Sequence, residues 1–402
     1  MLRMNNGLKV KTNSILPNYI TLLCSIILIT IITGKLYLEY LIPFIAFFCF
    51  LVKEKGVIRG CTGKNIFLLF GIFIAIQVMG LIKNLTIFSL KNIMTSGCMF
   101  LIIYTVLNGK VGIQKGYIKI YYVIACAAMF LLSKAEIITQ NTTAGGMTFL
   151  SLLLIILMSE ERYPSGKKGK GKYKTAVRLV VGMIPAIVFS FAVSARTALF
   201  VNLFLIVFYF LFSFFDFRAR TYRNMFCIMV VAIIAGLVFY INIRNYSWYT
   251  ALNAFSYQYF GKNIDSSRSY LWRTSLAELH GSDWIWGLGT GIRPFIPRYA
   301  NSSFHNSFIQ TLMQNGAVGL MCLIFIFGVI WNALAQIRER STRALFMSAF
   351  IAVVAYNCME CCLLQNKAFL GMIQWIILAI GVRYAAAYEQ ENQKKYMKWK
   401  GI

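Results

Sequence analysis

Long apolar segments alternate with short polar ones along almost the whole 402-residue chain. A helix needs about 20 mostly apolar residues to cross roughly 30 Å of hydrocarbon. The pattern predicts an all-α polytopic membrane protein with twelve candidate transmembrane helices. These helices are expected at 15–33, 36–52, 66–82, 93–108, 117–133, 146–159, 176–194, 197–215, 225–243, 315–335, 344–360 and 367–385.

One connection between these helices is much longer than the others. We expect residues 1–243 to carry the first nine transmembrane helices, and residues 244–304 to form a large extracytoplasmic loop with short helices. Residues 305–402 would then hold an interfacial helix, the last three transmembrane helices and a basic cytoplasmic tail. Long loops with structure of their own often carry function, so the search for chemistry begins there.

The composition and the charge agree with a membrane protein. Hydrophobic residues make up 59% of the chain and charged residues only 13%, whereas about 25% of a soluble domain is charged. The 40 Lys and Arg residues outnumber the 13 Asp and Glu residues, and 28 of the 40 fall on the side of the two termini. The positive-inside rule places that side in the cytoplasm. The protein is therefore expected in a membrane with both termini in the cytoplasm, and nucleic acid is not an expected partner.

The first short helix of the loop is expected at 265–279. Asp265 or Ser266 would be its N-cap, since short polar side chains accept hydrogen bonds from free amides at helix starts. Arg268 would then lie in the first turn. A guanidinium beside the positive end of a helix dipole is a favourable site for phosphate.

A second short helix is expected at 301–316, capped by Ser302 or Ser303 and ending near Gly316. It would place His305 in its first turn. The helix dipole disfavours a protonated imidazole there, so His305 is expected to stay neutral and able to accept a proton.

A third cation completes the candidate site. Arg196 lies in the hairpin between the seventh and eighth expected helices, on the same side as the loop, and an arginine at an apolar boundary is costly without a partner. We expect Arg196, Arg268 and His305 to converge on one anion. The alternatives are that Arg268 pairs with Asp265, that His305 caps a loop and that Arg196 extends to lipid headgroups.

Other chemical signals are weaker. Cys358 and Cys361 form a C-x-x-C without a second ligand pair, and residues 287–291 form a glycine-rich turn outside any strand–helix context. Neither a metal nor a cofactor is expected. Glu39 is a second candidate for the general base.

These residues, in this order, resemble the O-antigen ligase and O-antigen polymerase family of bacterial envelope proteins. Ala195 separates Ser194 from Arg196, where the family often has serine directly before arginine. The matching motifs are Ser194-Ala-Arg196-Thr, Asp265-Ser-Ser-Arg268-Ser-Tyr-Leu-Trp272, Gly287-Leu-Gly-Thr-Gly291, His305-Asn306 and Asn315-Gly316.

The resemblance implies a membrane C-type glycosyltransferase that is inverting and metal-independent. Members take a glycan from an undecaprenyl-pyrophosphate carrier at the outer leaflet; ligases transfer it to lipid A core and polymerases to another carrier-linked unit. On this basis Arg196 and Arg268 bind the donor pyrophosphate, and His305 acts as pyrophosphate ligand or base. Asn306, Trp272 and Arg293 are further substrate-binding candidates. A chain-length regulator and a flippase are the expected protein partners.

Two questions stay open at this point. Ligase and polymerase share the donor chemistry, and only the Lys-, Asn- and Ile-rich composition favours a polymerase of surface polysaccharide. The alternative of another class is a transporter of polysaccharide intermediates, which would place polar groups in the middle of its helices.

Overall fold

The computed structural model describes residues 61–108, 123, 127, 140–159, 171–299, 302–365 and 367–399. Within these residues every regular element is helical and there is no strand. The short elements are η2 (Ile243–Asn245), α10 (Tyr249–Phe260), α11 (Arg268–Ala277), α12 (Asp283–Trp286) and η3 (Pro297–Tyr299). The long helices are α3 (Cys61–Lys83), α4 (Ile87–Asn108), α6 (Gln140–Ser159), α7 (Gly171–Ala192), α8 (Arg196–Phe214), α9 (Ala219–Ile241), α13 (Ser307–Ala335), α14 (Arg340–Asn357) and α15 (Ala368–Trp399).

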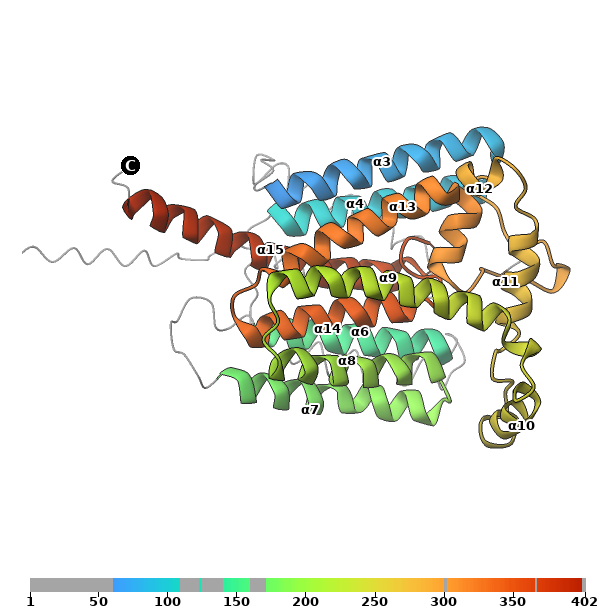
Figure 1. Cartoon of the computed structure of the whole chain (residues 1–402), viewed down its shortest axis with the longest axis horizontal. Coiled ribbons are helices and arrows are strands. Elements are labelled where there is room, and N and C mark those ends of the chain that lie inside the picture. Colours follow the sequence, from blue (N-terminus) through green and yellow to red (C-terminus); the bar gives the residue numbers. More distant parts are fainter. Residues whose placement is uncertain are drawn as a thin grey trace, which may run out of the picture.

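The long helices lie side by side in one bundle, and α10, α11 and α12 gather at one end of it (Figure 1). The closest helix pairs are α8 with α14, α3 with α13, α6 with α7 and α4 with α15, so partners are often far apart in the sequence. Large aromatic side chains fill the core between them. Trp331 contacts Phe350 on the neighbouring helix, and Phe70 contacts Trp375.

Eight of the described helices are long and apolar enough to cross a membrane: α3, α4, α6, α7, α8, α9, α13 and α15. The prediction of an all-α protein with membrane-spanning helices is confirmed at this level. The expected segments 15–33 and 36–52, and nearly all of 117–133, lie outside the described residues. Each of the other nine segments contains a helix.

The helix α14 differs from the other eight. It has only 18 residues and begins with Arg340 and Arg343, so its composition is more polar. It packs against α8, α13 and α15 and is buried along most of its length. By contrast, α9 exposes Ile228, Val231 and Ile234, as a helix in contact with lipid would.

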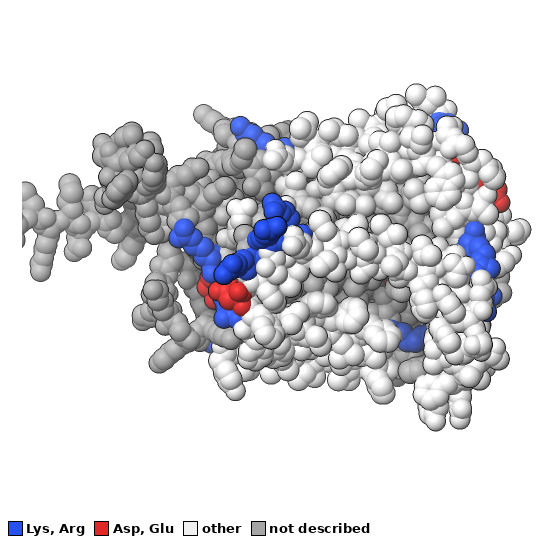
Figure 2. Space-filling view, in the orientation of Figure 1, with Lys and Arg blue, Asp and Glu red and all other residues white. Residues whose placement is uncertain are grey.

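Charged side chains lie towards the two ends of the bundle, and the face between them is almost free of charge (Figure 2). One end holds the connections from α8 to α9 and from α13 to α14, where Arg343 pairs with Asp216. The other end holds the α7–α8 hairpin, residues 242–299 and 302–306, and the described part of the connection from α14 to α15. The segments that charge assigned to opposite sides therefore lie at opposite ends.

The expected N-caps of the two short helices are wrong. Helix α11 begins at Arg268 with Ser267 as its N-cap, without a side-chain hydrogen bond, and ends at Ala277, so it is shorter than the expected 265–279. Asp265 and Ser266 are not the cap, because Asp265 turns its carboxylate towards Arg244 instead.

The second short helix is the first part of α13. Its N-cap is Asn306, not Ser302 or Ser303, because the Asn306 side chain accepts hydrogen bonds from the amides of Phe308 and Ile309. Its expected end near Gly316 is confirmed, because the backbone of Gly316 is not helical (φ 63°, ψ −168°) and a second helical segment follows across a kink.

The glycine-rich turn at 287–291 explains this kink. A side chain at Gly316 would collide with the carbonyl of Ile285, and one at Gly287 would collide with the backbone of Gln314. The amides of Leu288 and Gly289 donate to the carbonyls of Met313 and Gln314, at 2.8 and 3.1 Å. The turn therefore interlocks with the kink.

Candidate active site

A single carboxylate connects two of the expected site residues. Arg268 Nη2 donates to Glu360 Oε1 at 2.8 Å, and His305 Nδ1 lies 3.4 Å from Glu360 Oε2. The Glu360 side chain is 8% exposed and that of Arg268 14%, while His305 is 36% exposed. The imidazole therefore reaches solvent, and the ion pair behind it is shielded.

Arg196 approaches the same place from the α7–α8 hairpin. Its Nη1 donates to Ser256 Oγ at 3.1 Å, and its Nη2 donates to the carbonyl of Asn263 at 3.0 Å and to Ser266 Oγ at 2.7 Å. Ser266 is two residues before Arg268, and the two guanidiniums are close enough to repel each other. Arg196, Arg268, His305 and Glu360 are called the Glu360 cluster below.

Asp265 holds the backbone beneath this cluster. Its fully buried carboxylate accepts from Arg244 Nε at 2.8 Å, from the Tyr249 hydroxyl at 3.2 Å and from the Ser269 hydroxyl. The alternative in which Arg268 pairs with Asp265 is therefore wrong; Arg244 takes that position. Burial is the largest influence on the Asp265 pKa and would raise it, but the bonds from Arg244, Ser269 and the Ser267 amide outweigh it and lower the pKa.

The pKa of Glu360 is set by the same competition. Burial is the largest influence and would raise it. The hydrogen bond with His305 and the positive charges of Arg268 and Lys367 outweigh burial, so the pKa of Glu360 lies below its usual value. Glu360 is therefore an anion at neutral pH, and its negative charge offsets part of the positive charge of the cluster.

The backbone is strained at or beside Arg196, Arg268 and His305. Among the described residues, the only non-glycine positions with positive φ are Ser194, Ser266, Ser267 and His305. Such conformations cost about 1–3 kcal/mol each and concentrate at functional sites. All four lie within two residues of Arg196 or Arg268, or are His305 itself, which marks this end of the bundle as a site.

His305 is not in the first turn of a helix, which corrects its expected position. It precedes the N-cap Asn306 and has φ 51°, with its amide donating to Ser303 Oγ at 3.2 Å. The expected effect of the helix dipole on the imidazole therefore does not apply. Glu360 orients the ring instead.

Two further candidates occupy structural positions. Trp272 is fully buried, and its Nε1 donates to the carbonyl of Phe304 at 2.6 Å, which fixes the backbone beside His305. Asn306 is also buried, and its Nδ2 donates to the carbonyl of Cys358 at 2.7 Å. Both residues hold the Glu360 cluster in place without presenting a surface to a ligand.

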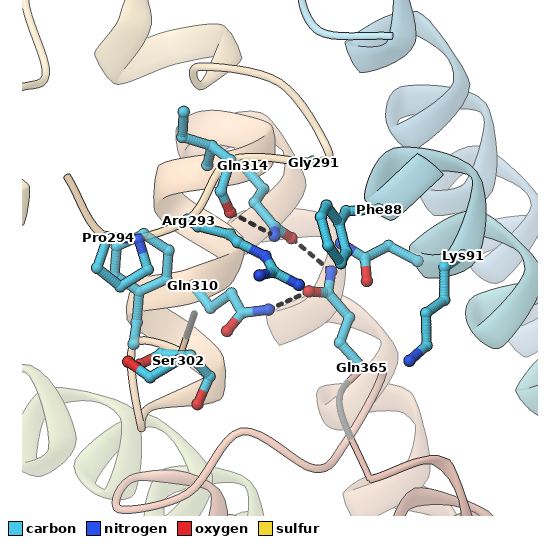
Figure 3. Close-up of a pocket in the computed structure, with 13 residues that line it drawn as sticks. Phe88, Lys91, Gly291, Arg293, Pro294, Ser302, Gln310, Gln314 and Gln365 are labelled. Carbon is cyan, nitrogen blue, oxygen red and sulfur yellow. Dashed lines mark hydrogen bonds between the residues drawn. The ribbon is translucent and has the colours of Figure 1, made fainter. Parts of the chain in front are cut away.

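Arg293 lies outside the Glu360 cluster. Its guanidinium carbon is 3.3 Å from the ring centroid of Phe88, and both residues line a separate pocket (Figure 3). Burial lowers the pKa of Arg293.

The cysteines near the site are buried thiols. Cys361 and Cys362 are buried, and burial raises the pKa of Cys362 to about 12 and that of Cys361 well above its usual range. Within the described part of the chain, no group of three or more His, Cys, Asp or Glu side chains could hold a metal ion. Glu39 lies outside the described residues.

Glu360, the residue that joins the cluster, belongs to none of the motifs found in the sequence. The only signal in the sequence is its acidic side chain, since Glu360 is one of few acidic residues expected on the outer side. Comparison with models of known protein families finds no match to this chain, and comparison with curated proteins finds no relative.

Proposed function

We propose that the protein is a membrane glycosyltransferase that transfers or polymerises oligosaccharide units carried on undecaprenyl pyrophosphate. The observation that carries this proposal is the convergence of Arg196, Arg268, His305 and Glu360 from distant segments of the chain. Two guanidiniums beside a carboxylate–imidazole pair supply both an anion site and a route for a proton, which are the two needs of this reaction.

The guanidiniums bind the donor diphosphate. A guanidinium has five N–H donors. Arg268 donates one hydrogen bond to Glu360. Arg196 donates three hydrogen bonds, to Ser256, Asn263 and Ser266. The remaining donors bind the diphosphate, where fixed positive charge stabilises the negative charge that grows on the leaving group.

The imidazole accepts the proton of the acceptor. The acceptor hydroxyl oxygen attacks the anomeric carbon of the donor glycan, and the bond from that carbon to the diphosphate oxygen breaks. The electron pair leaves with the carrier diphosphate. The hydroxyl proton passes to Nε2 of His305, because Nδ1 carries its own proton towards Glu360, and the resulting imidazolium lies beside a carboxylate.

The reaction takes place at the outer leaflet in this proposal. The chain lies in a bacterial cytoplasmic membrane with both termini in the cytoplasm, as the distribution of Lys and Arg favours. A flippase delivers the donor and a chain-length regulator acts on the product. The acceptor is another carrier-linked unit for a polymerase and lipid A core for a ligase.

Chain growth with purified protein tests the proposal. The full chain in detergent is mixed with an undecaprenyl-pyrophosphate-linked repeat unit, and products are separated on a gel. We expect a ladder that Arg196→Ala and Arg268→Ala abolish, while Arg273→Ala, an exposed arginine at the same end of the bundle, retains it. Absence of a ladder, together with movement of the lipid across vesicles, would identify a transporter instead.

A further inference from the structure

A second polar pocket adjoins the Glu360 cluster. Ser302, Ser303 and Phe304 line it, and His305 follows directly in the chain. The pocket opens to solvent and has a cavity volume of about 40 Å³. Its other walls come from the start of α4, the turn after residue 290 and the first turns of α13.

Three buried glutamines form a hydrogen-bonded ladder along one wall (Figure 3). Gln310 Nε2 donates to Gln365 Oε1, and Gln365 Nε2 donates to Gln314 Oε1. Gln314 Nε2 donates to the carbonyl of Ile292 at 3.3 Å, and Cys361 Sγ donates to Gln310 Oε1 at 2.6 Å. After these bonds each amide still has one free N–H and one free acceptor position. The ladder can therefore donate to the oxygen of a hydroxyl group and accept from its hydrogen.

Two cations complete the lining. Lys91 and Arg293 have no acidic partner among the described residues, and none of the described lining residues is acidic. Arg293 stacks on Phe88, which supports the guanidinium but does not neutralise it. The pocket therefore combines unpaired positive charge with groups that bind hydroxyls.

We propose that this pocket binds a sugar residue that carries a carboxylate, such as a uronic acid, on the acceptor glycan. The proposal rests on the proposed function, which makes the ligand a glycan. The carboxylate pairs with Arg293 and Lys91, and the ring hydroxyls bind the free amide groups of Gln310, Gln314 and Gln365. The pocket then holds the acceptor beside His305, so that the reacting hydroxyl lies near the base.

A lipid headgroup is the other source of an anion at this end of the bundle. A phosphodiester would pair with Lys91 and Arg293 and can accept from the free N–H groups of the three amides, but it has no O–H to donate to their oxygens. A carboxylated sugar uses both groups of residues, and for this reason we assign the pocket to the sugar.

Binding of small probes tests this assignment. The full chain is purified in detergent, and saturation-transfer NMR measures binding of methyl β-D-glucuronide and of neutral methyl β-D-glucoside. We expect the glucuronide to bind about tenfold more tightly, as loss of a charge-assisted contact implies. Arg293→Gln and Lys91→Gln should remove this preference, whereas Arg293→Lys, which keeps the charge, and Arg273→Gln, outside the pocket, should keep it.

The outcomes separate the two proposals. Equal binding of both sugars, or an unchanged preference in Arg293→Gln protein that elutes and melts like the unchanged protein, would overturn the sugar assignment. Displacement of the glucuronide by phosphatidylglycerol, and not by phosphatidylcholine, would assign the pocket to a headgroup and also overturn it. Inorganic pyrophosphate serves as the probe of the Glu360 cluster, and its binding should depend on Arg268 but not on Arg293. If pyrophosphate binding does not depend on Arg268, the result counts against the proposed function and not against the sugar assignment.

Discussion

Glu360 shows how one side chain can decide the character of a site. Arg268 and His305 come from α11 and from the turn before α13, and the carboxylate between them comes from the connection after α14. The sequence motifs are sufficient to group Arg196, Arg268 and His305. They do not extend to Glu360, because no local pattern indicates which distant partner a lone carboxylate will meet.

Replacement of the carboxylate by an amide tests its role. Glu360→Gln keeps the shape but removes the charge that orients His305, so we expect transfer to fall by about 100-fold or more. Pyrophosphate binding should persist, because Arg196 and Arg268 remain. The ladder assay and a pyrophosphate titration measure the two effects, and full transfer by the variant would contradict the assignment.

The ionisation of Glu360 also predicts a dependence of stability on pH. Its pKa is lowered in the folded protein. The contribution of the ionised carboxylate to the free energy of unfolding is therefore fully present above its pKa in the unfolded chain, about 4.3. The contribution is lost as the pH falls through the lowered folded pKa. The difference in melting temperature between the protein and Glu360→Gln should therefore be constant from about pH 7 to 5 and shrink in stronger acid. A difference that grew on acidification would be inconsistent with the lowered pKa.

At the scale of elements, the transmembrane helices and the presence of two short helices were predictable, but the N-caps of the short helices were not. Nine expected spans that fall on described residues contain helices, because a long apolar run dictates a helix wherever water is absent. The caps depended on tertiary contacts. Asp265 lies in a sequence typical of an N-cap, but the ion pair of its buried carboxylate with Arg244 determines its position. Asn306 caps α13 and also donates to the carbonyl of Cys358.

The interlocked kink predicts a strong effect of one methyl group. Gly316→Ala forces an alanine to φ 63° and against the Ile285 carbonyl, so we expect a loss of stability of more than about 1 kcal/mol. Gly236→Ala in α9 is the matched control, since nothing lies within 4 Å of its added methyl. Thermal unfolding in detergent measures both, and equal melting temperatures would exclude the interlock as a source of stability.

For the whole molecule, the distribution of charge predicts an orientation in the membrane. Ser282 is exposed at the end that holds the Glu360 cluster, and Arg338 is exposed at the opposite end. A membrane-impermeant thiol reagent should label Ser282→Cys in intact cells, and Arg338→Cys only after the membrane is opened. The unchanged protein gives the background from native cysteines such as Cys227, which is exposed. The reverse pattern would place the cluster in the cytoplasm.

The ion pair between Arg268 and Glu360 also bears on competition from the surrounding membrane. Phospholipid phosphates vastly outnumber any carrier lipid there, and an unopposed pair of guanidiniums would be occupied by whichever anion is most abundant. Since Glu360 already satisfies part of Arg268, a ligand with a single negative charge gains little by entering. In the proposed function, a ligand with two adjoining phosphates gains more, so the internal carboxylate would act as a threshold that favours a rare molecule over a common one.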